Sequence, residues 1–217
     1  MQRCMAIFVP NERLQIILMA LYRAPMISPV QLIHPRRFGD ARGWFTEVYS
    51  EPAFAKLGID CRFVQDNHSL SVPKYTLRGL HFQTPPSGQD KLVRCVRGAI
   101  FDVAVDIRKG SPTYGNWVGA ELSAENGHQL FIPIGFAHGF LTLGDNCEVT
   151  YKCSDTYAPD ADGGIRWNDP AFGAGGIDWP MPAGTIPELS AKDAVQPLLA
   201  DFDSPFPYDG RPLGPLV

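Results

Sequence analysis

The sequence lacks the cysteine spacing that is typical of disulfide-rich proteins and of structural zinc sites. Its five cysteines (Cys4, Cys61, Cys95, Cys147 and Cys153) are odd in number, irregularly spaced and without a Cys-x-x-Cys pair. A disulfide framework or a structural zinc site is therefore not expected, and a reducing compartment such as the cytoplasm fits best. No block of like charges occurs, which argues against a charged disordered tail.

Positive charge is also scarce. The 217 residues include 19 Lys and Arg against 23 Asp and Glu, which gives a formal net charge of −4 and a pI near 5.7. Surfaces that bind nucleic acid usually carry clustered Lys and Arg. We therefore expect no nucleic-acid partner.

Long hydrophobic runs are missing as well. The apolar stretch over residues 16–22 is too short to span a bilayer, so no membrane partner is expected. Charged and proline residues before it, with Arg23 after it, fit a cleavable signal peptide poorly. Residues 1–25 are interpreted as a helical or disordered extension from an upstream start codon, with Met26 as the older start.

Glycine and proline, by contrast, are abundant, with 21 and 20 residues, which favours short strands and turns. Alternation with a period of two dominates residues 90–152. Over residues 99–107 it predicts a strand with an apolar face and a polar face that carries Asp102 and Asp106. Further strands are expected over residues 91–97, 117–122, 129–132, 139–143 and 148–152. Short strands at this spacing predict a mainly β chain, folded as an antiparallel sandwich or barrel.

Few helices are expected, all short and peripheral. One is predicted over residues 52–57, and Ser190 with Asp193 three residues later is typical of a capped helix start. Residues 154–182 are rich in Gly, Asp and Pro and predict a long structured loop. The main domain is expected over residues 26–202, and the Pro-rich tail over residues 203–217 is expected to be extended or disordered.

One tract concentrates chemical groups. Residues 76–83 carry Arg78 and His81 on an apolar segment, and Lys91, Asp102, His138 and Tyr151 follow on strand-like segments. A guanidinium suits an anion, an imidazole carries protons near neutral pH, and a phenol is able to donate one. The set indicates proton transfer on an anionic substrate.

Several segments, in one order along residues 33–199, resemble the dTDP-4-dehydrorhamnose 3,5-epimerase family. The matching segments are residues 38–43, 63–69, 78–83, 91–95, 101–108, 122–126, 132–140, 167–169 and 189–193. The resemblance implies a cupin-like jelly roll that needs no metal or organic cofactor. It implies a dTDP-4-keto-6-deoxyhexose substrate, whose C4 ketone acidifies the hydrogens at C3 and C5. A base removes a proton, an enolate forms, and a proton returns on the opposite face.

The resemblance also implies catalytic roles. His81 is the expected base and Asp193 its carboxylate partner, although the spacing from Ser190 alone favours a capping role for Asp193. Lys91 is expected to meet the enolate oxygen, and Tyr151 to return the proton. Asp102 either orients Lys91 or His81, or faces solvent.

The implied substrate contacts are Arg42, Glu47, Gln65, Asn67, Arg78, His138 and Lys192. Tyr157 stands where the family stacks an aromatic ring on thymine. Asp162 stands where relatives often carry Glu, which puts that contact in doubt. Residues such as Arg42 and Glu47 reach the neighbouring subunit's site in relatives, so a homodimer is implied.

Three alternatives remain open. The first is an epimerase that acts at C3 or C5 only. The second is a metal-dependent cupin oxygenase, which typically needs two histidines one residue apart plus a carboxylate, whereas the five histidines include no His-x-His. The third is a sugar-nucleotide binding protein without catalysis, which has no need of the His81 and Tyr151 pair.

Overall fold

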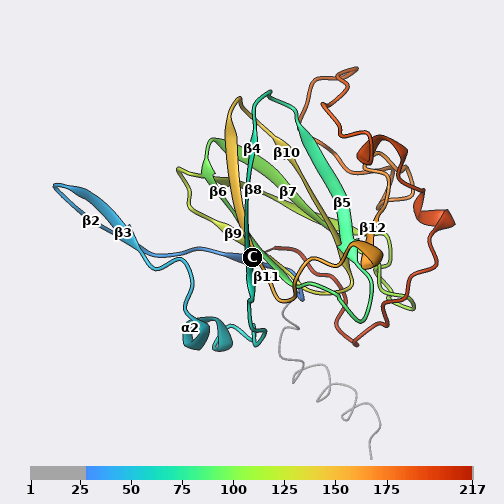
Figure 1. Cartoon of the computed structure of the whole chain (residues 1–217), viewed down its shortest axis with the longest axis horizontal. Coiled ribbons are helices and arrows are strands. Elements are labelled where there is room, and N and C mark those ends of the chain that lie inside the picture. Colours follow the sequence, from blue (N-terminus) through green and yellow to red (C-terminus); the bar gives the residue numbers. More distant parts are fainter. Residues whose placement is uncertain (1–27, 217) are drawn as a thin grey trace, which may run out of the picture.

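Two stacked antiparallel sheets form the body of the computed structural model, which describes residues 28–216 (Figure 1). The first sheet has the strand order β1 (Gln31–Ile33), β9 (Gln129–Ile132), β6 (Lys91–Arg97), β11 (Cys147–Cys153) and β4 (Gln65–Ser71). The second has the order β12 (Asp162–Gly164), β5 (Leu77–Gln83), β10 (Phe136–Thr142), β7 (Ala99–Asp106) and β8 (Trp117–Ser123). The predicted antiparallel jelly roll is confirmed. The expected extension over residues 1–25 lies outside the described residues.

A two-stranded hairpin stands apart from this body. It consists of β2 (Arg37–Asp40) and β3 (Gly43–Thr46), and Figure 1 shows it projecting into solvent beyond the first sheet. The short helix α2 (Glu51–Ala55) follows it and confirms the helix predicted over residues 52–57. The other helical elements are the 3-10 turns η1 (Pro159–Ala161), η2 (Asp193–Val195) and η3 (Leu199–Asp201). Within residues 28–216, no helix is long and apolar enough to cross a bilayer.

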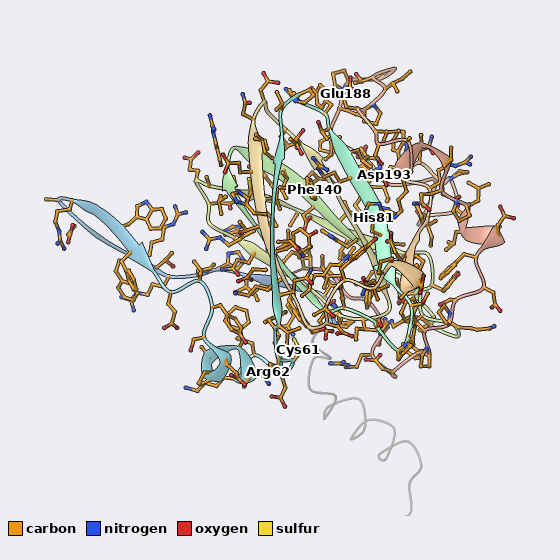
Figure 2. The ribbon with its side chains drawn as sticks, viewed as in Figure 1. Cys61, Arg62, His81, Phe140, Glu188 and Asp193 are labelled. Atoms are coloured by element: carbon orange, nitrogen blue, oxygen red, sulfur yellow. The ribbon has the colours of Figure 1, made fainter. Side chains whose placement is uncertain are left out.

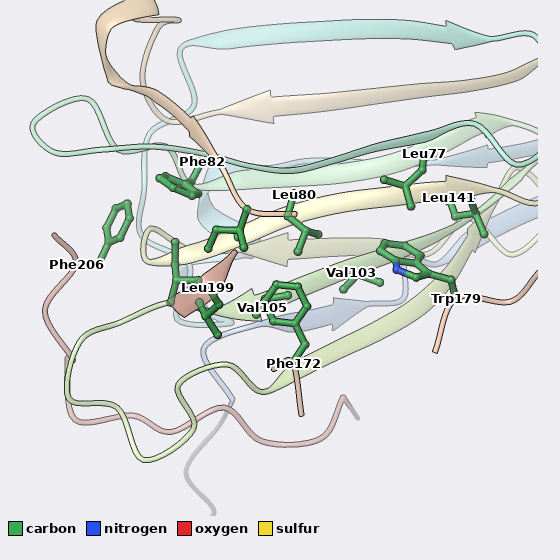
Figure 3. Close-up of a cluster of buried hydrophobic side chains, with 13 residues drawn as sticks. Leu77, Leu80, Phe82, Val103, Val105, Leu141, Phe172, Trp179, Leu199 and Phe206 are labelled. Atoms are coloured by element: carbon green, nitrogen blue, oxygen red, sulfur yellow. The ribbon is translucent and has the colours of Figure 1, made fainter. Parts of the chain in front are cut away.

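Strand β7 is almost entirely buried, so of the alternatives left open for Asp102 the solvent-facing one is wrong. Asp102 and Asp106 are both 0% exposed. One apolar cluster lies between the two sheets, and its members include Val93, Ile100 and Phe140. A second cluster lies on the opposite face of the second sheet, under the chain that follows β12 (Figure 3). The polar residues of β7 that point between the sheets are therefore enclosed.

The helix predicted from Ser190 is also wrong. The chain makes a single 3-10 turn at η2, and the next residue, Gln196, is extended with ψ 147°. Pro197 follows, and a residue before proline is pushed out of the helical region. Ser190 keeps part of its expected role, because its Oγ accepts a hydrogen bond of 3.1 Å from the Asp193 backbone N–H. The Asp193 carboxylate is thus available for another partner.

Over residues 204–216, the tail has no helix or named strand and packs against the domain. Phe206 is buried beside Phe82. Arg108, itself only 2% exposed, donates to Asp106 through Nε at 2.9 Å and to Asp209 through Nη1 at 2.6 Å. The buried guanidinium therefore links β7 to the C-terminal segment.

This linkage predicts a large loss of stability on replacement of Arg108. In Arg108→Met, the buried Asp106 carboxylate loses its ion-pair partner, and we expect the free energy of unfolding to fall by about 3 kcal/mol or more. Chemical denaturation of both proteins measures the difference. Lys109→Met is the matched control, because its ion pair with Asp203 is exposed on both sides and such pairs contribute little. Equal stability of the two variants would contradict the role given to Arg108.

Candidate active site

A β-bulge in β5 brings the guanidinium and the imidazole of the sequence tract to one side of the sheet. Side chains of a regular strand alternate, so Arg78 and His81, three residues apart, would face opposite sides. His81 pairs with His138 and Arg78 pairs with Phe140, which leaves one more residue on β5 than on β10. The extra residue reverses the alternation. Both side chains consequently face the space between the sheets.

Gly79 makes this bulge possible. Its φ is +134°, and a Cβ at this position would lie 2.5 Å from the Cα of Gly139 on β10. Only a residue without a side chain combines that backbone conformation with so close an approach. The two glycines therefore set how β5 and β10 pair beneath the site.

Most of the predicted catalytic side chains line a pair of cavities between the sheets, although Asp193 lines only one of them and Asp102 lines neither. One has a volume of about 270 Å³ and the other of about 260 Å³. Both are lined by His81, Lys91, Tyr151 and Lys192. These residues come from β5, β6, β11 and the segment before η2, so groups far apart in sequence meet at one place.

His81 is held by Asp193. Its Nε2 lies 2.5 Å from Asp193 Oδ1, and Figure 2 shows the two residues side by side, one on β5 and one on the C-terminal segment. Burial acts to raise the pKa of Asp193, but hydrogen bonds and charge attraction from His81, with bonds from Ser190 and Gly79, hold it below its ordinary value. Because an ionised carboxylate only accepts, the neutral imidazole carries its proton on Nε2. Nδ1 is then the basic nitrogen.

Lys91 contacts the backbone of His81 and is only 8% exposed. Its Nζ donates to the His81 carbonyl oxygen at 3.4 Å. Burial lowers the pKa of Lys91, while Cys153, Asp102 and Asp162 act to raise it. A buried ammonium is poorly solvated, and it therefore gains most from an anionic oxygen placed beside it.

Asp102 is paired with His138 rather than with His81 or Lys91. Its Oδ1 accepts from His138 Nε2 at 2.7 Å, and both side chains are buried. Burial raises the pKa of Asp102 and lowers that of His138. His138 lines the second cavity, and Asp102 lies behind it, fully buried and outside the lining of both cavities.

Tyr151 lines both cavities from β11, on the inner face of the first sheet. Burial raises the pKa of its phenol, the charge of Cys153 adds to this, and Arg78 opposes it. The phenol is therefore protonated at neutral pH, the state from which it is able to donate a proton.

The predicted substrate contacts divide into groups. Gln65, Asn67, Tyr157 and Asp162 line the first cavity, and Arg78 and His138 line the second. Asp162 Oδ2 accepts from the Tyr157 hydroxyl at 3.3 Å and forms an ion pair with Lys192. These residues frame the first cavity, and Tyr157 as a whole remains 59% exposed.

Arg42 and Glu47 are not brought to this site. Arg42 lies at the turn of the hairpin, where its side chain is 90% exposed and paired with Asp40. Neither residue lines the two cavities. The hairpin that carries Arg42 also exposes Phe38, Trp44 and Phe45.

Two glutamines that line the first cavity were not predicted from the sequence. Gln83 and Gln89 line it beside Gln65. Gln83 is the last residue of the tract that holds Arg78 and His81, and this position is the one feature of the sequence that could have indicated a place in the site. Within the described residues, no group of three or more His, Cys, Asp or Glu side chains is arranged to hold a metal ion. The expectation that no cofactor is needed stays a prediction.

Comparison with known proteins points to one family. A family model described as dTDP-4-dehydrorhamnose 3,5-epimerase matches residues 25–201. Enzymes of that name from Sinorhizobium fredii and Salmonella typhimurium are 52% and 55% identical, over 86% and 80% of this chain and 93% and 92% of their own length. The crystal structure of the Legionella pneumophila dTDP-6-deoxy-D-glucose-3,5-epimerase in complex with dTDP-4-keto-L-rhamnose is 47% identical, with a TM-score of 0.73. The match covers 79% of this chain and 88% of that one.

The bulge predicts that Gly79 tolerates no side chain. In Gly79→Ala, the added Cβ collides with the β10 backbone, and we expect a lower melting temperature together with loss of activity. Thermal unfolding and an activity assay measure both. Gly144→Ala is the control, because no atom lies within 4 Å of its added Cβ. Wild-type activity in Gly79→Ala would contradict the role of the bulge.

Proposed function

Because the chain belongs to the dTDP-4-dehydrorhamnose 3,5-epimerase family, we propose that His81 and Tyr151 exchange protons with opposite faces of one bound sugar ring. The chain is a sugar epimerase, an isomerase of dTDP-rhamnose biosynthesis. It inverts C3 and C5 of dTDP-4-dehydro-6-deoxy-D-glucose to give dTDP-4-dehydro-L-rhamnose.

His81 is the base. The C4 ketone makes the hydrogens at C3 and C5 acidic, since the electron pair left by either proton is delocalised onto the ketone oxygen. Nδ1 of His81 accepts the proton, and the ring becomes an imidazolium. Asp193, on the other nitrogen, stabilises that charge and fixes the orientation of the ring. The hydrogen bond between the two residues is the observation that carries the proposal.

Lys91 stabilises the enolate. Negative charge develops on the C4 oxygen as the proton leaves carbon, and a positive charge already in place stabilises it without reorganisation of solvent. Burial lowers the pKa of Lys91, and the enolate oxygen opposes this shift by favouring the charged form. The ammonium and the enolate therefore stabilise each other.

Tyr151 returns a proton to carbon from the opposite face. Its phenol is held in the protonated form by burial, and the enolate is the base that takes its proton. Return from the face opposite His81 inverts the carbon. Between the two inversions the His81 imidazolium gives its proton to water and the Tyr151 phenolate takes one from water, and the same two groups then act at the second of the two carbons, C3 and C5.

The remaining residues of the two cavities bind the nucleotide and the sugar. Arg78 and Lys192 are the cationic groups for the diphosphate, because charge-assisted hydrogen bonds to phosphate oxygens are strong. Tyr157 stacks on the thymine ring, and Gln65 and Asn67 lie beside it in the same cavity. His138, oriented by Asp102, contacts the sugar. Asp162 takes part through its ion pair with Lys192.

Isotope exchange tests these roles. After incubation with dTDP-4-keto-6-deoxyglucose in deuterated water, we expect the wild-type product to carry deuterium at both C3 and C5. His81→Ala is expected to exchange at neither carbon, with a rate at least about 100-fold below wild type because the base is absent. Mass spectrometry and proton NMR of the product measure both.

The Tyr151→Phe variant tests the role of Tyr151 as the acid separately from the role of His81 as the base. We expect it to retain exchange, because His81 still removes protons, while net inversion is lost. Label at a single carbon in the wild type would instead support the one-centre epimerase. Wild-type turnover of Tyr151→Phe would remove Tyr151 from the mechanism.

We further propose that the protein is a homodimer in which the hairpin completes the partner's site. Arg42 and Glu47 are substrate contacts in this proposal, yet they lie outside the cavities of their own protomer. The exposed Trp44 and Phe45 of the hairpin are apolar groups that a second copy would bury. A cytoplasmic location is proposed from the free thiols of Cys61, Cys95, Cys147 and Cys153.

A mixing experiment tests this shared site. Arg42→Ala and His81→Ala are each expected to have low activity at low substrate concentration. In a mixed dimer of the two, one site combines an intact His81 with the partner's intact Arg42. Random exchange of subunits is therefore expected to restore about a quarter of wild-type activity, because half of the dimers are mixed and each has one intact site. No recovery after verified exchange would contradict a shared site.

A further inference from the structure

Gln83 binds the backbone on both sides of Tyr157. Its Nε2 donates to the Thr156 carbonyl oxygen at 3.2 Å, and its Oε1 accepts from the Ala158 N–H at 2.9 Å. The same Nε2 donates to the Ser87 carbonyl oxygen at 2.7 Å. The side chain is only 4% exposed, so water does not compete for these bonds. Gln83 thus fixes one peptide group before Tyr157 and one after it.

Two other glutamines hold the same stretch. Gln65 Oε1 accepts from the Tyr157 N–H at 3.0 Å, and Gln89 Nε2 donates to the Asp155 carbonyl oxygen at 2.8 Å. Side-chain amides from β4, β5 and the loop after β5 therefore converge on residues 155–158. We call residues 65, 83 and 89 the glutamine clamp.

The clamp leaves the Tyr157 ring exposed while its backbone is fixed. Tyr157 as a whole is 59% exposed, although its main-chain neighbours are tied to the sheets. An aromatic ring in a loop normally loses conformational freedom when a base stacks on it, and this loss weakens binding. A backbone that is already ordered removes much of that cost.

We propose that Gln83 and Gln89 are positioning residues that raise nucleotide affinity by holding Tyr157 ready for stacking. The inference rests on the proposed role of Tyr157 in binding thymine. Neither glutamine needs to touch the reacting carbons, so both act on binding and not on proton transfer. The ligand concerned is the nucleoside diphosphate part of the substrate.

A double-mutant cycle with dTDP as the ligand tests the proposal. We expect Tyr157→Ala to weaken dTDP binding by about tenfold, the usual effect of removing one stacked ring. Gln83→Met, which keeps the length of the side chain and removes its hydrogen bonds, is expected to weaken binding by a similar or smaller factor. The double variant is expected to bind dTDP as Tyr157→Ala does, because Gln83 acts through Tyr157. Isothermal titration calorimetry measures all four affinities.

Steady-state kinetics adds a second readout. Gln83→Met is expected to raise KM and to leave kcat near the wild-type value.

Should Gln83→Met fail to fold, Gln89→Met takes its place in the cycle, since Gln89 makes a single bond to the loop. Asn126→Ala is the control for loss of a side chain that anchors a loop, because Asn126, although only half-buried, also makes three bonds to backbone, in the turn after β8. Its dTDP affinity is expected to match wild type.

Two results would overturn the proposal. One is unchanged dTDP affinity in a folded Gln83→Met. The other is an equal loss of affinity on adding Gln83→Met to wild type and to Tyr157→Ala, which would mean that Gln83 acts independently of the ring. Binding of dTDP requires no turnover, so failure of the wild type to epimerise would count against the proposed function and leave the cycle interpretable.

Discussion

The hydrogen bond between His81 Nε2 and Asp193 Oδ1 is the interaction on which the site depends. It joins residues 112 positions apart in the chain, one on β5 and one at the start of η2. Two independent features must be in place before it forms. The bulge at Gly79 must turn His81 between the sheets, and the single turn of η2 must leave the Asp193 carboxylate free. A local change in either segment therefore acts directly on the base.

Burial between the two sheets explains the electrostatics of the site. Lys91 and Tyr151 stand on β6 and β11 of the first sheet and line the cavities between the sheets, where contact with bulk water is reduced. Burial lowers the pKa of Lys91 and raises that of Tyr151. Both shifts have one cause, because removing a charged group from water disfavours its charged form. The Lys91 ammonium is therefore stabilised by an anion placed beside it, and the Tyr151 phenol keeps its proton.

Much of the fold was predictable, because period-2 alternation is a local property of the sequence. It located β6 and β9 at their bounds and β7, β8, β10 and β11 to within a few residues. The motifs also identified His81, Lys91 and Tyr151, which meet in the cavities.

The buried state of Asp102 was not predictable, since alternation does not reveal a second layer on the other side of a sheet. The helix expected from Ser190 failed because Pro197 and the bond to His81 outweigh a good cap. Almost nothing in the sequence indicates the glutamine clamp, because its hydrogen-bond partners are backbone groups of a distant loop.

The tautomer of His81 is the most direct test of this account. In ¹⁵N NMR of the protein labelled at histidine, neutral His81 is predicted to carry its proton on Nε2, where Asp193 accepts it, and to leave Nδ1 bare. In Asp193→Asn, this preference is predicted to weaken, since an amide is able to either donate or accept. A neutral His81 protonated on Nδ1, or an unchanged spectrum in Asp193→Asn, would contradict the assignment of Nδ1 as the base.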